Sequence, residues 1–250
     1  MNYKALMLDV DGTLIPNNRN GLPSNAVIKA IKKANKKIHV GIATARPLSV
    51  LENILSVLPL SGPSIINGGS QIIDLPSQKI LKEQPIEIHD VLKICTIAKQ
   101  FKIKPIIIND TDEDIELSKD YKPYKPFQVY MPDVSSKNRD EFLQTISHIS
   151  HVSVHKTVSW RRGGIDIFIT HSLATKHHGV LEVARILGIT PKEIIGVGDG
   201  YNDFSLLLSC GLKIAMGNAI SDLKAIADYT APSVEKDGLV KVIKKFVLGV

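Results

Sequence analysis

Two aspartates directly follow an apolar stretch near the start of the chain. The stretch runs from Tyr3 to Leu8, and Asp9, Asp11 and Gly12 come after it. Because two carboxylates this close repel each other, we expect either a divalent cation between them or a proton on one of them. In either state one aspartate can attack as a nucleophile while the other delivers and recovers a proton. The spacing therefore predicts nucleophilic and acid–base chemistry, with a solvated turn as the alternative.

Further polar side chains follow other apolar stretches or open a predicted helix. They are Thr44, Arg46, Lys176, Asp199, Asn202 and Asp203. Ligands of an open parallel sheet bind at the carboxyl ends of its strands, so we expect these groups to share one crevice. Phosphoryl transfer needs cations and hydrogen-bond donors fixed around the phosphate oxygens. Each residue alone has an ordinary alternative as a cap, a turn former or a surface lysine, but the set together predicts a site for a phosphate monoester.

The elements that must position these residues alternate between strand and helix. Apolar stretches predict strands at 3–8, 38–43, 64–66 and 194–198, and periodic stretches predict helices after Ser24 and at 48–58, 176–187 and 238–248. Alternation of this kind is typical of a parallel sheet with right-handed crossovers. The sequence thus predicts an α/β protein with a doubly wound parallel sheet.

The alternation changes between residues 80 and 170. Here we expect strands at 79–81, 105–109, 127–131, 151–160 and 165–170, and helices at 88–101 and 137–149. This β-α-β-β-α-β-β order predicts a smaller α/β domain inserted into the first fold. The predicted domains are therefore a core formed by residues 1–79 and 171–250, and an insert formed by residues 80–170.

Composition narrows the classes of partner. The chain has 250 residues, of which 44% are hydrophobic and 22% charged, as in ordinary soluble globular proteins. No apolar run approaches the ~20 residues that cross a bilayer, and no leader precedes the first strand, so we expect a cytoplasmic protein without a membrane partner. The formal net charge is +6, but the lysines are dispersed and aromatic residues make up only 5%. We therefore expect no nucleic-acid partner, and a monomer or weak homo-oligomer.

Several motifs resemble those of the haloacid dehalogenase superfamily, most closely its Cof-type or subfamily IIB hydrolases. They are D-V-D-G-T-L at 9–14, I-A-T-A-R-P at 42–47, I-N-G-G at 66–69, Lys176, G-D-G-Y-N-D at 198–203, A-M-G-N-A at 215–219 and D-G-L at 237–239. The resemblance covers essentially the whole chain. It implies a Rossmann-like core, a mobile cap over the leaving group, and a Mg²⁺-dependent phosphatase of small phosphorylated metabolites that forms an aspartyl-phosphate. Two positions depart from the family pattern, because Ala45 and His177 stand where glycine is usual.

The resemblance also implies roles for individual residues. Asp9 would be the nucleophile and Asp11 the general acid/base, with Lys176 as a third catalytic group. Mg²⁺ would be held by Asp9, the backbone carbonyl of Asp11, and Asp199. The phosphate ligands would be the amides of Val10 and Asp11, with Thr44, Lys176 and Asn202. From the residues themselves, we expect Asp203 to orient a metal-bound water or to hold Lys176 by a salt bridge.

Other predictions concern substrate choice and competing functions. The expected substrate contacts are Arg46, Trp160, Arg161 and Arg162, and a surface turn is the alternative for the last three. A phosphomutase would share the first steps, and a phosphoaspartate receiver or a non-catalytic phospho-metabolite sensor would share the strand-end aspartates and the lysine. We expect the pair His177 and His178 not to bind metal, the acidic stretch 110–116 to be solvated, and the free cysteines Cys95 and Cys210 to be buried as small hydrophobes.

Overall fold

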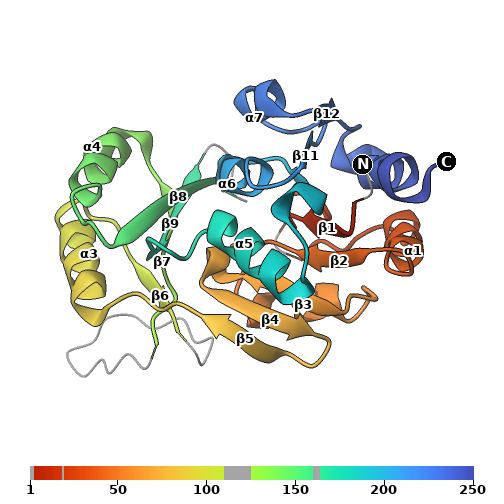
Figure 1. Ribbon diagram of the computed structural model, residues 1–250. Helices are drawn as coiled ribbons and strands as arrows, with labels where there is room; N and C mark the ends of the chain where they lie inside the picture. Colours follow the sequence, from red (N-terminus) through yellow and green to blue (C-terminus); the bar gives the residue numbers. More distant parts are fainter. Residues whose placement is uncertain (1–2, 19, 110–124, 160–163) are drawn as a thin grey trace.

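A five-stranded parallel sheet forms the centre of the larger part of the molecule (Figure 1). The computed structural model describes residues 3–18, 20–109, 125–159 and 164–250. In spatial order the strands are β12 (Tyr229–Thr230), β11 (Leu212–Ala215), β10 (Ile194–Gly198), β1 (Ala5–Leu8) and β2 (His39–Ile42). Because β1 lies between β10 and β2, the loops that follow these three strands start side by side.

Helices cover both faces of this sheet. One face carries α1 (Asn25–Ala34) and α8 (Gly238–Ile243), which continues as a π-helical segment at Lys244–Leu248. The other face carries α5 (Lys176–Leu187), α6 (Phe204–Leu207) and α7 (Ser221–Ile226). Strand β1 is apolar throughout because Leu6 and Leu8 pack on the first face while Ala5 and Met7 pack on the second. The predicted doubly wound α/β core is confirmed.

A small antiparallel sheet extends the core beyond β2. It contains β3 (Gly62–Ile66), β4 (Gln71–Leu75) and β5 (Lys79–Glu83). Strand β3 also touches the parallel sheet, since Ala43 bridges to Ile65 and the Thr44 amide donates to the Ile65 carbonyl at 3.0 Å. We expected β5 to open the insert, but it pairs with β4 instead. We therefore infer that the insert begins after Glu83.

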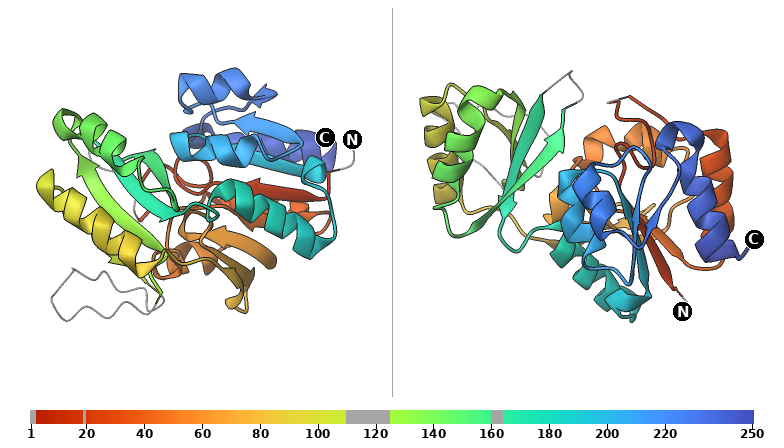
Figure 2. Two further views of the ribbon diagram at one scale, coloured as in Figure 1. Left: turned by 60° about the vertical axis from the view of Figure 1, so that its left-hand side comes forward. Right: turned by 90° about the horizontal axis from the view of Figure 1, so that it is seen from above.

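The insert forms a two-layer unit of its own. It contains α3 (Ile88–Gln100), β6 (Ile106–Ile108), β7 (Gln128–Val134), α4 (Ser136–Ile146), β8 (Val152–Val158) and β9 (Ile165–His171). The strands form an antiparallel sheet in the order β6-β7-β9-β8, and both helices cover its outer face (Figure 2). Side chains alternate on β9, where Ile167 packs under the helices while Asp166 and Phe168 line the cleft on the opposite face.

Element boundaries follow local chemistry at several positions. Helix α1 begins after Ser24, whose side chain accepts a hydrogen bond from the Val27 amide at 3.2 Å. Helix α5 ends at Gly188, which adopts the left-handed conformation with φ 65°. The continuous helix predicted at 48–58 is wrong, because the structure has a 3₁₀ turn at Leu48–Val50 and a short helix α2 at Glu52–Leu55.

The two cysteines are free thiols in apolar surroundings. Cys95 is buried in the core of the insert, and Cys210 is partly buried beside α6. Burial raises the pKa of the Cys95 thiol to about 11 and that of Cys210 to about 12. Both therefore behave as small hydrophobes, as predicted. Across the described residues, no helix has both the length and the apolar character needed to cross a membrane.

Candidate active site

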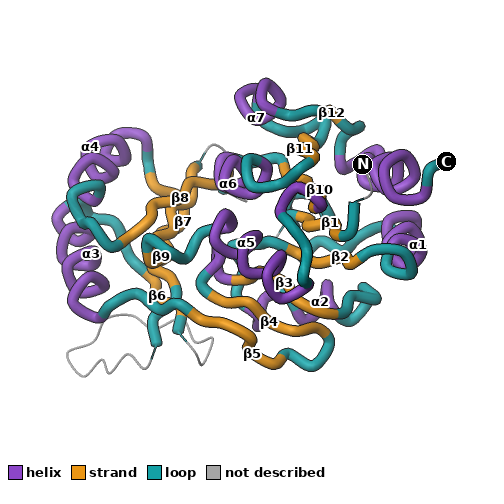
Figure 3. The backbone as a smooth tube through the Cα atoms, viewed as in Figure 1, coloured by secondary structure: helices purple, strands orange, loops and turns teal. Residues whose placement is uncertain are grey.

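A cleft of about 410 Å³ lies between the core and the insert. On the core side its lining residues come from the loops that follow β1, β2 and β10. These residues include Asp9, Asp11, Thr44, Arg46, Asp199 and Asn202. Figure 3 draws the loops of the backbone in teal and the strands in orange. The opposite wall is the open face of the four-stranded sheet of the insert. The side chains predicted to share one crevice at the strand ends are thus brought together.

Lys176 lies behind the floor of the cleft, between two carboxylates. It is the first residue of α5, its side chain is only 2% exposed, and Nζ lies 2.6 Å from Asp9 Oδ1 and 2.6 Å from Asp203 Oδ1. Burial alone would lower the pKa of Lys176, but Asp203 and Asp9 outweigh it and raise the pKa above its usual range. The lysine is therefore a fixed positive charge in contact with Asp9.

Asp203 uses both of its carboxylate oxygens to hold neighbouring groups. Oδ1 accepts from Lys176, and Oδ2 accepts hydrogen bonds from the amides of Asp199 and Gly200, each at 2.9 Å. The side chain is fully buried. Of the two roles predicted for Asp203, the geometry matches the salt bridge to Lys176. Asp203 also fixes the loop after β10, which carries Asp199.

Asp9 and Asp199 form the part of this acidic cluster that is open to a cation. Oxygens of Asp9, Asp199 and Asp203 lie within 4.8 Å of one another. Burial, followed by neighbouring carboxylates, raises the pKa of Asp9 to about 8 and of Asp199 to about 9. No residue in the described ranges donates a hydrogen bond to Asp9 Oδ2 or to Asp199 Oδ1. This donor set fits a divalent cation, which would supply the missing positive charge.

The backbone after β1 approaches Asp199 closely. Gly12 has φ 77°, and a Cβ atom at this position would overlap the Asp199 carboxylate. Asn218 joins the same two residues, because its Nδ2 donates to the Gly12 carbonyl at 2.7 Å and to Asp199 Oδ2 at 3.0 Å. The amide of Val234 donates to Asn218 Oδ1 at 2.9 Å. Asn218 was not predicted as a site residue, although the A-M-G-N-A motif contains it.

Arg46 binds the side chain of Asp11. Its Nε lies 2.9 Å from Asp11 Oδ2, and its Nη2 lies 2.5 Å from Asp11 Oδ1. A third hydrogen bond runs from Nη2 to the Asn18 carbonyl at 3.2 Å. The Arg46 side chain is 4% exposed, whereas the Asp11 side chain is 22% exposed. Arg46 contacts the predicted acid/base and also lines the cleft, and its predicted contact with the substrate stays a prediction.

Thr44 and Asn202 lie at the cleft as separate neutral groups. The Thr44 hydroxyl accepts a hydrogen bond from the Arg46 amide at 3.1 Å. The hydroxyl proton of Thr44 has no acceptor among the residues that the structure describes. The Thr44 hydroxyl can therefore donate a hydrogen bond to a phosphate oxygen. Asn202 is partly exposed at the start of the segment that leads into α6. The other predicted substrate contacts, Trp160, Arg161 and Arg162, and the acidic stretch 110–116 lie outside the described residues.

The two adjacent histidines of α5 have different partners. His177 Nδ1 lies 2.7 Å from Ser209 Oγ, whereas His178 Nδ1 lies 2.9 Å from Thr175 Oγ1. Their rings stand at 77° to each other. The two imidazoles thus make separate contacts, and the expectation that the pair does not bind metal stays a prediction.

The wall formed by the insert carries a few polar groups in apolar surroundings. The Tyr130 hydroxyl donates to Asp166 Oδ2 at 2.7 Å, and the Asp133 amide donates to Asp166 Oδ1 at 2.8 Å. Gln128 crosses to the core and donates to the Ala45 carbonyl at 3.2 Å. None of these residues was predicted, because alternation along a strand does not reveal which face of the sheet lies over the site.

Comparison with known families decides the identity of this arrangement. The model of the haloacid dehalogenase-like hydrolases matches residues 6–243. This chain belongs to that family. The resemblance to haloacid dehalogenase hydrolases is confirmed, and the protein is a phosphatase of phosphoric monoesters. A subclass IIB sugar phosphatase shares the fold, with a TM-score of 0.76 and 23% identity.

Relatives of this haloacid dehalogenase-like hydrolase span its full length. A 5-amino-6-(5-phospho-D-ribitylamino)uracil phosphatase of Bacillus subtilis is 27% identical over 256 residues, covering 99% of this chain and 97% of the relative. A phosphoglycolate phosphatase of Methanobrevibacter smithii is 24% identical, covering 99% of this chain and 100% of its own. The fold matches that of a haloalkanoate-superfamily phosphatase of Bacteroides thetaiotaomicron, with a TM-score of 0.80, 23% identity and coverage of 98% and 95%.

Proposed function

We propose that this phosphatase requires Mg²⁺ and hydrolyses small phosphorylated metabolites through a phosphoaspartate on Asp9. The observation that carries the proposal is the environment of the Asp9 carboxylate. One oxygen contacts the Lys176 ammonium at 2.6 Å, no described residue donates to the other, and the carboxylate belongs to the cluster with Asp199. A carboxylate fixed at a strand end in this way is suited to in-line attack on a phosphorus atom.

The first step transfers the phosphoryl group to the enzyme. A carboxylate oxygen of Asp9 attacks phosphorus, the bond from phosphorus to the leaving-group oxygen breaks, and Asp11 gives a proton to that oxygen. In the second step Asp11 takes a proton from a water molecule, which attacks the same phosphorus. The bond from the Asp9 oxygen to phosphorus then breaks and inorganic phosphate leaves. Asp9 and Asp11 both return to their starting states.

The groups around Asp9 supply the charge that this transfer needs. Lys176 holds the Asp9 carboxylate in position and offers its remaining N–H to the phosphoryl oxygens, while Thr44 and Asn202 add neutral donors. The amides of Val10 and Asp11 complete the phosphate ligands that we expect. Bound by Asp9, Asp199 and the Asp11 carbonyl, Mg²⁺ would neutralise charge on the phosphoryl oxygens.

The lining and the volume of the cleft indicate which class of leaving group it accepts. Its insert wall combines apolar side chains with polar ones, and the Asp166 carboxylate among them disfavours an anionic leaving group. A volume of about 410 Å³ exceeds what the two-carbon carboxylate of phosphoglycolate would fill. We therefore propose a neutral organic leaving group with hydroxyls or a flat ring, which the Tyr130 hydroxyl and Phe168 would contact.

A panel of phosphorylated metabolites tests this function. Phosphate release is measured with and without Mg²⁺ from polyol, sugar, nucleotide and cofactor phosphates and from phosphoglycolate. We expect metal-dependent release, with the highest kcat/KM for a neutral leaving group. Analysis of the organic product separates hydrolysis from a phosphomutase, which would return an isomeric phosphate. Absence of release from every compound by folded, Mg²⁺-loaded protein would contradict the proposal and favour a sensor.

A further inference from the structure

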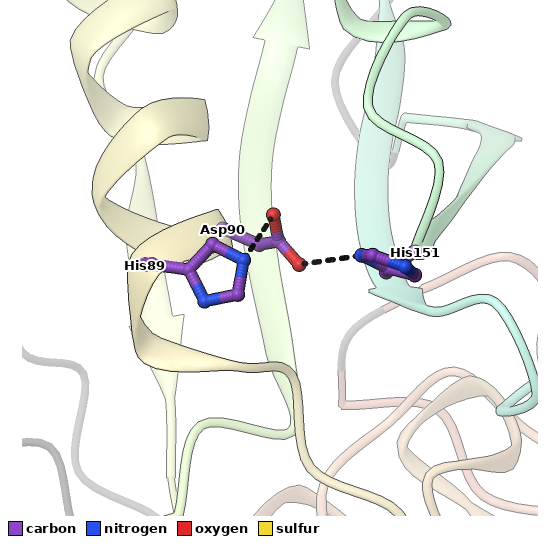
Figure 4. Close-up of side chains that lie close together, drawn as sticks. All are labelled: His89, Asp90 and His151. Atoms are coloured by element: carbon purple, nitrogen blue, oxygen red, sulfur yellow. Dashed lines mark ion pairs between the residues drawn. The ribbon is translucent and has the colours of Figure 1, made fainter.

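A second group of potential metal ligands lies in the insert, away from the cleft (Figure 4). It consists of His89 and Asp90 in the first turn of α3 and His151 just before β8. His89 Nε2 lies 3.2 Å from Asp90 Oδ1, and His151 Nδ1 lies 3.8 Å from Asp90 Oδ2. One ligand atom from each residue lies within 4.8 Å of the other two. The three side chains thus converge on one point from two separate segments.

Asp90 is placed where an amphipathic helix normally carries an apolar residue. It shares the buried side of α3 with Val91, Ile94 and Ala98, and its side chain is only 5% exposed. Among the described residues, its Oδ2 has no hydrogen-bond partner. A buried carboxylate oxygen without a partner costs free energy, so its presence calls for a positively charged ligand.

Histidine ion pairs alone do not meet this requirement. The side chains of His89 and His151 are 71% and 64% exposed, so water screens their interaction with the Asp90 carboxylate. The 3.8 Å separation between His151 and Asp90 Oδ2 also exceeds the length of a hydrogen bond. Two imidazoles facing one carboxylate are a set of three metal-binding groups.

We propose that His89, Asp90 and His151 bind one divalent transition-metal ion of the zinc class. Imidazole nitrogens together with a carboxylate oxygen suit Zn²⁺ rather than Mg²⁺, which prefers oxygen ligands. Ligand atoms of a tetrahedral zinc ion lie about 3.3 Å apart. The His89 contact has nearly this separation, and metal binding would draw the exposed His151 ring, now 3.8 Å from Asp90 Oδ2, closer. Water completes the coordination on the exposed side.

The ion would join two segments next to the connections between the insert and the core. His89 follows the first connection, which links β5 to α3 through residues 84–87. His151 adjoins the second connection, because its carbonyl accepts a hydrogen bond from the Ser172 amide at 2.9 Å. Binding therefore ties the start of α3 to the end of the strand pair that leads back to α5. We expect it to raise the thermal stability of the protein.

Cobalt(II) binding tests the proposal without relying on activity. Metal-free protein is given Mg²⁺ in large excess to fill the carboxylate cluster of the cleft, and Co²⁺ is then titrated while visible absorption and bound metal are measured. We expect one Co²⁺ per chain, with absorption bands typical of nitrogen ligation, and displacement of Co²⁺ by Zn²⁺. His89→Gln and His151→Gln should each lower the affinity at least about 10-fold.

A matched variant excludes the other histidine pair. His177→Gln removes an exposed histidine of α5 and should leave the Co²⁺ titration unchanged. Equal binding by the wild type and a His89→Gln/His151→Gln double variant would overturn the proposal, as would loss of binding in His177→Gln. If a variant fails to fold, ¹⁵N shifts of the histidine rings in the wild type decide the question. Zn²⁺ must move the signals of His89 and His151, and unchanged signals would overturn the proposal.

Discussion

Arg46 holds Asp11 by a two-point contact, with Nε 2.9 Å from Oδ2 and Nη2 2.5 Å from Oδ1. Two parallel hydrogen bonds fix the orientation of a carboxylate more firmly than one does. Asp11 must reach the leaving-group oxygen during the proposed reaction, so part of this contact has to break when substrate binds. Arg46 is thus a positioning residue for the acid/base. A change at Arg46 should therefore affect substrates whose leaving group needs a proton more than substrates whose leaving group departs as an anion.

Arg46→Met should impair turnover most strongly where the leaving group needs a proton. General acid catalysis contributes about 10²–10⁴-fold, and we expect a loss of kcat/KM near the lower end for an alkyl phosphate. p-Nitrophenyl phosphate has a leaving group that departs as an anion, so its kcat/KM, which does not include hydrolysis of the phosphoaspartate, should fall much less. Steady-state kinetics with both substrates checks this, and Asp11→Asn should show the same contrast more strongly. Equal losses for both substrates would mean that Arg46 does not act through Asp11.

Lys176→Met should destabilise the protein as well as inactivate it. The substitution leaves Asp9 and Asp203 buried together without their shared cation, and breaking a buried pair costs about 3–5 kcal/mol. Urea denaturation measures the free energy of unfolding. Mg²⁺ should restore part of the lost stability of Lys176→Met because it binds the carboxylate cluster. The double variant Lys176→Met/Asp203→Asn should be more stable still, because it removes one buried carboxylate. A variant as stable as the wild type would refute the proposed coupling.

His155 should make stability depend on pH on the acid side. Burial, followed by the charge of Lys176, lowers the pKa of His155 to about 4. Because an unfolded histidine titrates near 6.5, the unfolded state binds more protons between pH 6.5 and 4. The contribution of His155 to the free energy of unfolding is therefore complete above pH 6.5 and is lost as the pH falls to 4. Allowing for partial exposure, it amounts to roughly 1–3 kcal/mol.

The test compares unfolding free energies at several pH values. His155→Gln should flatten the decline between pH 6.5 and 4, whereas the exposed His148→Gln should not change it. Parallel curves for the wild type and His155→Gln would contradict the prediction. Loss of the stacking of His155 on Phe168, with ring centroids 4.8 Å apart, lowers stability at every pH and so does not affect the comparison of slopes.

Asn218→Ala should weaken Mg²⁺ binding, although Asn218 is not one of the proposed Mg²⁺ ligands. The side chain joins the Gly12 carbonyl to Asp199 Oδ2, and removal of such an outer partner typically lowers metal affinity by about 10–100-fold. Titration of activity with Mg²⁺ gives the apparent affinity. The exposed Asn53→Ala serves as the control. An unchanged Mg²⁺ dependence would remove Asn218 from the metal site.

The core and the positions of its catalytic groups could be predicted from local patterns. Apolar stretches end where Asp9, Thr44 and Asp199 begin, and parallel strands bring their carboxyl ends to one edge. The contact of Asn218 with Gly12 joins residues 206 positions apart and depends on how the loop after β11 folds back. No local periodicity contains that information.

Sequence patterns also did not predict which strands pair at the start of the insert. Its helices and strands were predicted close to their observed bounds, but the partner of β5 was not, since an amphipathic edge strand fits either sheet until its neighbours are known. Likewise, the sequence does not say which of the carboxylates at the strand ends Arg46 binds. Only the three-dimensional arrangement selects Asp11.

The most direct test of the proposed chemistry is phosphate release by the wild type and by Asp9→Asn under the same conditions. The substrate is the best compound of the metabolite panel, and each protein is assayed with Mg²⁺ and after removal of divalent metal by chelation. The account predicts rapid release by the wild type only with Mg²⁺, and none above background by folded Asp9→Asn. Release by Asp9→Asn at a rate close to that of the wild type would contradict a phosphoaspartate on Asp9.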